Sequence, residues 1–153
     1  MLQGYEFESK MRIMMEKIKR TFFIRAARRD VWNALVDPKL LAAWGAGPAR
    51  MSTRTGAKFS LWGGDIFGRI IEVVKEKKLV QEWSAKAWDK PSKLIMVFKL
   101  EKLGTKIELT QTGVPKQEYA SYRDGWQDSY FAPLKSYLEE RGDDPGFEHH
   151  QGG

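Results

Sequence analysis

Large apolar side chains alternate with polar ones in several short stretches of the chain. An alternation of period two places every second side chain on one face of a strand, whereas a helix repeats its apolar positions every three or four residues. The alternating stretches are rich in β-branched and aromatic residues, which favour strands. They predict six strands, at residues 18–25, 57–62, 65–74, 79–88, 93–100 and 105–113.

Short turns separate the predicted strands from the second to the sixth. Gly63 and Gly64 suit a tight hairpin between the second and third strands. In the third strand the alternation changes phase between Ile66 and Val73, and a bulge near Gly68 restores it. Turns of hairpin length require antiparallel pairing, so we expect one antiparallel sheet.

Two short helices are predicted between the first and second strands. Residues 28–36 carry an apolar face, and Asp30 lies near the positive N-terminal end of this helix. Asp37 is a favourable N-cap and Pro38 suits the first position of the second helix. The glycine-rich and proline-containing segment 45–48 ends it.

The last apolar segment, residues 125–139, predicts a long helix. Pro133 removes one helical hydrogen bond and crowds the preceding turn, so we expect a kink that lets the helix follow a curved sheet. Two shorter helices remain an alternative interpretation. Large apolar side chains recur every four residues and form one stripe along the helix: Trp126, Tyr130, Leu134 and Leu138.

Together these elements predict an α+β fold. We expect a curved six-stranded antiparallel sheet wrapped around a long C-terminal helix, with two short helices after the first strand. A chain of 153 residues is most simply one domain, and we place it at residues 17–141. Residues 1–16 are predicted to form a loosely packed leader, and residues 142–153 a disordered tail.

The chain has a formal net charge of +6 and no cysteine. Basic side chains crowd its N-terminal part, where Arg25, Arg28 and Arg29 are candidates for binding an acidic protein partner. No nucleic-acid-binding motif accompanies the charge, so nucleic acid is not an expected partner. No apolar run reaches the roughly 18 residues of a membrane span. We expect a cytoplasmic protein, which the absence of cysteine fits.

Patterns for catalysis or metal binding are weak in this sequence. The two histidines, His149 and His150, lie in a glycine-flanked terminal segment with no further ligand to fix a metal. Asp65, Glu72 and Glu82 are the carboxylates best placed for acid–base chemistry, but nothing in the sequence pairs them in space. The sequence therefore predicts a protein that is not an enzyme and that holds no metal or cofactor.

A set of mainly aromatic side chains either lines a cavity between the sheet and the helix or fills the hydrophobic core. Gln111 favours the cavity, because a polar amide on the face of Ile107 and Leu109 needs a partner, a water or a ligand. A mostly apolar pocket with few polar groups is typical of small-molecule sites. The candidate cavity residues are Trp44, Phe59, Trp83, Phe98, Gln111, Trp126 and Tyr130.

Some runs of residues are more specific than this general pattern. Asp37-Pro38 with Trp44 resembles the segment after the first helix of START-like helix-grip proteins (the SRPBCC superfamily). Further runs follow in order at residues 56–66, 76–83, 111–115, 125–126 and 130–131. In this order they resemble the C-terminal domain of the activator of Hsp90 ATPase family, over roughly residues 18–140.

The resemblance implies a curved sheet that grips the C-terminal helix, with a cavity between them, and it does not imply catalysis. It implies an Hsp90-type chaperone as partner, and a role as a noncatalytic ATPase-activator-like co-chaperone or stress-response module. The alternative that it implies is a carrier or sensor that binds a small apolar ligand in the cavity between sheet and helix.

Overall fold

A computed structural model describes residues 15–142 of the chain. The remaining parts of the predicted leader and tail, and with them His149 and His150, lie outside the described residues. The first strand begins at Met15, two residues before the predicted start of the domain. None of the helices in the described part is long and apolar enough to span a bilayer.

The six described strands form one antiparallel sheet, as predicted. Its spatial order is β1-β6-β5-β4-β3-β2, so β1 and β2 are the two edges. Only the pairing of β1 with β6 joins strands that are distant in the sequence. The strand bounds are β1 Met15–Ile24, β2 Lys58–Leu61, β3 Ile66–Val74, β4 Lys78–Ala85, β5 Ser92–Glu101 and β6 Gly104–Pro115.

The hairpin between β2 and β3 is wider than predicted. Leu61 pairs with Ile66, and the intervening loop contains a 3-10 turn, η1 (Trp62–Gly64). Trp62 was expected at the end of a strand, but it has a φ of 49° and belongs to the loop. The hairpin needs left-handed backbone at Trp62 and at the two glycines that follow it. The glycines adopt this conformation without strain, whereas Trp62 adopts it at a steric cost.

The bulge in β3 lies between Ile70 and Glu72, and not near Gly68 as predicted. Gly68 has a different role, since a Cβ there would collide with the carbonyl oxygen of Glu82 and would lie 2.9 Å from the Phe59 ring. The glycine is thus required by close approach of the neighbouring strands, and the phase change of the alternation is absorbed two residues later.

The two predicted short helices are present as α2 (Arg28–Val36) and α3 (Pro38–Trp44). The Asp37 side chain accepts a hydrogen bond of 2.8 Å from the Lys39 backbone N–H, which confirms it as the N-cap of α3. Gly45 ends α3 in the left-handed conformation that glycine favours.

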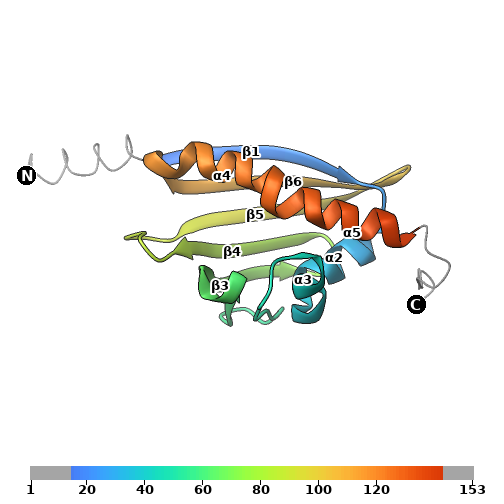
Figure 1. The fold of residues 1–153 in the computed structure, drawn as a ribbon, viewed down its shortest axis with the longest axis horizontal. Helices are drawn as coiled ribbons and strands as arrows, with labels where there is room; N and C mark the ends of the chain where they lie inside the picture. Colours follow the sequence, from blue (N-terminus) through green and yellow to red (C-terminus); the bar gives the residue numbers. More distant parts are fainter. Residues whose placement is uncertain (1–14, 143–153) are drawn as a thin grey trace, which may run out of the picture.

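The C-terminal helix is continuous but begins earlier than predicted. It consists of α4 (Tyr119–Gly125), a π-helical segment η3 (Trp126–Phe131) and α5 (Ala132–Gly142). The irregularity expected at Pro133 takes the form of this π-helical segment, which ends two residues before the proline. Figure 1 shows the combined helix running along the side of β1 and β6, with α2 and α3 beside its C-terminal end.

The sheet has two unlike faces because side chains alternate along each strand. The inner face packs on the helices and is almost wholly buried. The opposite face, which we call the open face, carries the exposed positions of the same strands. One cross-strand row on it contains Lys17, Thr112, Lys93, Glu82, Arg69 and Lys58.

Candidate functional site

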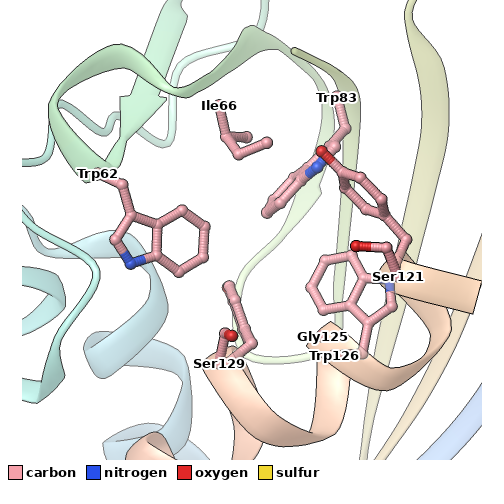
Figure 2. A pocket seen from close by; sticks show the side chains of 9 residues that line it. Trp62, Ile66, Trp83, Ser121, Gly125, Trp126 and Ser129 are labelled. Carbon is pink, nitrogen blue, oxygen red and sulfur yellow. The ribbon is translucent and has the colours of Figure 1, made fainter. Parts of the chain in front are cut away.

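A pocket of about 320 Å³ opens between the first half of the C-terminal helix and the β2–β4 side of the sheet. Figure 2 shows Trp62 on one side of the pocket, and Trp83 and Trp126 on the opposite side. Its walls are mainly aromatic, with two serines and a glycine contributed by the helix. The lining residues are Trp62, Ile66, Trp83, Ser121, Tyr122, Gly125, Trp126, Ser129 and Tyr130.

The hairpin loop holds Trp62 at the pocket. Left-handed backbone at Trp62 turns its side chain out of the strand alternation, and its Nε1–H donates to the Gly45 carbonyl oxygen at 2.8 Å. This bond ties the hairpin to the end of α3. Both the unusual backbone and the hydrogen bond therefore fix the indole as a wall of the pocket.

The π-helical segment supplies the wall that faces the sheet. Trp126 and Tyr130 are both buried, and their rings lie 5.0 Å apart in an edge-to-face arrangement. Trp126 also contacts Trp83 of β4, with 4.9 Å between the ring centres. A π-helical turn is common at functional sites in helices.

A chain of buried hydrogen bonds joins the helix to the sheet behind the pocket. Trp126 Nε1–H donates to Gln111 Oε1 at 2.9 Å, and Gln111 Nε2–H donates to Ser92 Oγ at 2.9 Å. The Ser92 hydroxyl in turn donates to the carbonyl oxygen of Trp83 at 2.7 Å. The Gln111 amide, which needs a partner inside the protein, thus bonds to Trp126 and Ser92. The same network connects Trp126 to the backbone of Trp83, so it fixes both of these pocket residues.

The indole N–H of Trp83 is different from the others described at or near the pocket. Trp44, Trp62 and Trp126 each donate their Nε1–H to an oxygen. Trp83 is only 2% exposed, and its Nε1 has no hydrogen-bond partner. An unpaired buried donor costs about 1–3 kcal/mol, so the Trp83 N–H is an energetically costly feature of a residue that lines the pocket.

The two pocket tyrosines remain protonated at neutral pH. Burial, assisted by the nearby Glu118 carboxylate, raises the pKa of Tyr122 to about 12. Burial also raises the pKa of Tyr130 well above its ordinary value. The lining contains no aspartate, glutamate, histidine, lysine or arginine. The pocket of the described chain is therefore uncharged over the ordinary pH range.

Three of the predicted cavity residues, Trp83, Trp126 and Tyr130, line this pocket. The remaining four are buried but are not part of its lining, namely Trp44, Phe59, Phe98 and Gln111. Trp44 packs edge-on against Tyr130 with 4.9 Å between the rings, and Phe98 packs edge-on against Trp32 at 5.4 Å.

Sequence reasoning missed several lining residues. Trp62 was assigned to a strand, and its position after a strand and before two glycines was the available signal. Ser121 and Tyr122 lie before the predicted start of the helix, where the apolar period is weak because α4 has no fully buried residue. Ser129 lies on the exposed side of the predicted stripe, and only the geometry of the π-helical segment places it at the pocket.

The three candidate partner-binding arginines differ in their surroundings. Arg25 donates its backbone N–H to Glu139 Oε2 at 2.9 Å, and its Nε lies 3.8 Å from Glu139 Oε1. Arg28 and Arg29 are half-buried on the first turn of α2, and Arg28 Nε is buried without a partner. Arg25 thus holds the end of the helix to the end of β1, in addition to any role at the surface.

The candidate acid–base carboxylates do not meet at the pocket. Glu72 forms an ion pair with Lys78 at 3.3 Å. Glu82 lies on the open face, in the cross-strand row beside Lys93 and Arg69. Asp65 belongs to the β2–β3 loop and is exposed. Among residues 15–142, no group of three histidine, cysteine, aspartate or glutamate side chains is placed to hold a metal ion.

The fold and the pocket together define a helix-grip domain, in which a curved antiparallel sheet holds a long C-terminal helix over an aromatic cavity. Residues 25–139, more than half of the chain, match the family model described as Activator of Hsp90 ATPase homolog 1-like protein. The chain belongs to this family.

Relatives and solved structures agree with this assignment. The human Activator of 90 kDa heat shock protein ATPase homolog 1 is 27% identical over 121 residues, which cover 77% of this chain and 35% of the human protein. The Hsp90 co-chaperone AHA1 of Saccharomyces cerevisiae is 28% identical over 117 residues, which cover 69% of this chain and 33% of the yeast protein. The chain thus spans about a third of the length of the curated relatives it matches. A crystal structure of an HSP90 activator from Plasmodium falciparum superimposes with a TM-score of 0.70 at 24% identity, covering 82% of this chain and 96% of that one, which supports the fold.

Proposed function

We propose that this chain is a noncatalytic domain that binds an Hsp90-class chaperone and acts as a co-chaperone. Membership of the activator family supports this role, since relatives are named as activators or co-chaperones of that ATPase. A cytoplasmic location belongs to the same proposal. The observation in this chain that carries it is the charge of the open face.

Basic side chains form a row across the open face. In the row that crosses all six strands, four of the six residues are basic and Glu82 is the one acid. Lys17, Lys93 and Arg69 of this row are exposed. Phe67, on the same face, keeps 41% of its surface exposed. A surface of clustered positive charge with an exposed aromatic ring suits contact with an acidic protein surface.

Such a surface acts mainly on the rate of association. Complementary charge steers the encounter of two proteins and is screened by salt over about 8–10 Å. We therefore expect binding to the chaperone to weaken as the salt concentration rises. Arg28 and Arg29, two of the three sequence-derived candidates, lie on α2 at the helix side of the sheet, and would form a separate basic site.

The test mixes the purified domain with Hsp90 from the same organism and measures the association rate and ATP turnover across salt concentrations. The paired change Lys17→Glu with Lys93→Glu should slow association about tenfold at low salt, and less at high salt. The control pair, Lys39→Glu with Lys116→Glu, makes the same charge change at exposed positions outside the sheet. Arg29→Glu tests the α2 candidates, whereas Arg25 is left intact because of its contact with Glu139.

An absence of binding at high micromolar concentration would contradict the proposal. An equal loss with the control pair would mean that net charge, and not the open face, controls association.

A second function, a carrier or sensor of a small apolar ligand, is favoured by one specific observation. The aromatic pocket of about 320 Å³ has the size and composition of small-molecule sites, and one wall carries the unpaired N–H of Trp83. Aromatic probes should change tryptophan fluorescence and raise thermal stability by binding the folded state preferentially. A broad panel without either response would remove this second function.

A further inference from the structure

We propose that the pocket binds an uncharged, planar aromatic molecule that carries a hydrogen-bond acceptor, and that Trp83 Nε1–H is the donor that recognises this acceptor. The proposal rests on the second function above and goes further, because it names the chemical class of the ligand and the atom that selects it.

The shape of the pocket favours a flat ligand. Trp62 faces Trp83 and Trp126 across the pocket, so that indole rings bound it on two sides (Figure 2). Aromatic rings gain most from offset or edge-to-face contact with other rings. The network through Gln111 holds Trp126, and the bond to Gly45 holds Trp62, so both walls are preorganised. A rigid cavity of this kind loses little conformational entropy on binding.

The chemistry of the lining favours an uncharged ligand. No side chain that lines the pocket carries a charge at neutral pH, because both of its tyrosines stay protonated. An ionised group placed among these aromatic rings would lose its hydration without a counter-ion. Ser121 and Ser129 are exposed, so a polar substituent of the ligand is tolerated where it meets the helix surface.

The unpaired N–H defines the remaining feature. Trp83 contacts the rings of Trp126 at 4.9 Å, Phe59 at 5.9 Å and Tyr130 at 6.2 Å. Of these rings only Tyr130 carries an oxygen, and it does not accept from the Trp83 N–H. An indole nitrogen is a donor only, which means that it selects a carbonyl, ether or hydroxyl oxygen or an unprotonated ring nitrogen. A ligand without such an atom would leave the N–H unsatisfied, which is how buried polar groups reject close analogues.

Fluorenone and fluorene are matched probes for this proposal. Both are planar, uncharged and of nearly equal size, but only fluorenone has a carbonyl oxygen. We expect fluorenone to bind the intact protein about tenfold more tightly than fluorene, as for one buried hydrogen bond gained. Binding is measured by quenching of tryptophan fluorescence and by titration calorimetry.

Two variants separate the donor from the aromatic wall. Trp83→Phe keeps an aromatic ring but removes the N–H, so the two probes should then bind equally. Trp62→Phe is the matched control, because the Trp62 N–H already donates to Gly45 and is not available to a ligand. This control should weaken both probes and keep the preference for fluorenone.

Nuclear magnetic resonance gives a readout that does not depend on affinity. The chain has six tryptophans, and the Trp83 indole N–H signal is identified by sequential resonance assignment of the isotope-labelled, unmodified protein. Fluorenone should shift this signal strongly downfield, and fluorene should not. Should the Trp83→Phe variant fail to fold, this comparison in the unmodified protein still decides the matter.

The outcomes distinguish the proposal from the function on which it rests. Binding of both probes with equal affinity and no downfield shift of the Trp83 signal would overturn the role of Trp83, while leaving ligand binding intact. No binding of either probe would overturn ligand binding itself. A preference for fluorenone that survives Trp83→Phe would assign the donor to another group, such as Tyr122.

Discussion

The two ends of the C-terminal helix contact the sheet in different ways. At the closed end, Leu134 and Leu138 of α5 are buried together with α2 side chains in the apolar core. Phe131 stacks there on Phe22 with 4.0 Å between the ring centres. At the pocket end, the Trp126 side chain is held by a hydrogen bond to Gln111, and the Trp83 N–H beside it has no partner.

In the proposed ligand-binding function, the helix serves folding at its closed end and recognition at its pocket end. Side chains at the closed end bury apolar surface, whose removal from water is the main source of stability. The pocket end leaves the Trp83 donor unpaired, which costs stability, and the proposed ligand would satisfy this donor. The π-helical segment lies at the change from one end to the other.

Leu134→Ala should give the largest effect and tests the closed end. Leu134 is fully buried, so the free energy of unfolding should fall by about 2–5 kcal/mol. Ser129→Ala at the pocket end is the control and should change it by less than about 0.5 kcal/mol. Denaturant titration measures both, and similar losses in the two variants would contradict the division of the helix.

Two buried glutamines on the inner face differ in their hydrogen bonds. Gln111→Leu removes both hydrogen bonds of its amide and leaves the Trp126 N–H unpaired, so unfolding should become easier by about 1–3 kcal/mol. Gln81 is equally buried, but its Oε1 has no partner and its Nε2 only approaches Met51 Sδ at 3.6 Å. Gln81→Leu should therefore be neutral or stabilising in the same denaturant titration. A loss at Gln81 as large as that at Gln111 would contradict this account of the network.

The pH dependence of stability tests Tyr122 at the mouth of the pocket. Because burial raises its pKa from 10.0 to about 12, Tyr122 contributes stability that is fully present below pH 10 and is lost as the pH rises toward 12. The loss should be roughly 1–2 kcal/mol, since the side chain is only half-buried. Tyr122→Phe should reduce the alkaline fall measured by thermal unfolding, and an unchanged fall would place the titration elsewhere.

The smallest effect is expected at the contact between Arg25 and the helix end. Burial acts to raise the pKa of Glu139, but the Arg25 backbone N–H and the Lys135 ammonium outweigh it and lower that pKa below 4.5. The ionised Glu139 carboxylate therefore stabilises the fold at pH values above its unfolded-state pKa of about 4.5. This contribution is lost as the pH falls through the lower pKa of the folded state. Glu139→Gln should cost about 1 kcal/mol at pH 7 and nothing in acid, as measured by unfolding at both pH values. A cost that persists in acid would contradict the charge argument.

Most of the fold was predictable from the sequence because the alternation and the buried helical stripe are strong local signals. The strands at β1, β5 and β6 follow from alternation alone, since one face is buried and the other is not. The exact position of the β3 bulge was not predictable, because it depends on how Gly68 is crowded by the neighbouring strand.

The pocket was predictable only in part. Trp83 belongs to a regular strand, and Trp126 and Tyr130 belong to the apolar stripe that recurs every four residues, so their buried faces follow from the sequence period. Trp62 reaches the pocket through left-handed backbone, and Ser129 through π-helical geometry, and neither has a sequence period that reveals it. Whether an aromatic side chain fills the core, like Phe98, or bounds a cavity depends on three-dimensional packing.

A crystal structure of the protein bound to fluorenone would show the pocket end and the closed end of the helix in one experiment. We expect the fluorenone oxygen within about 2.7–3.2 Å of Trp83 Nε1, with the ring between Trp62 and Trp126 and the side chains around Leu134 unmoved. Fluorenone bound among the α5 side chains or on the open face, with the pocket end empty, would contradict the claim.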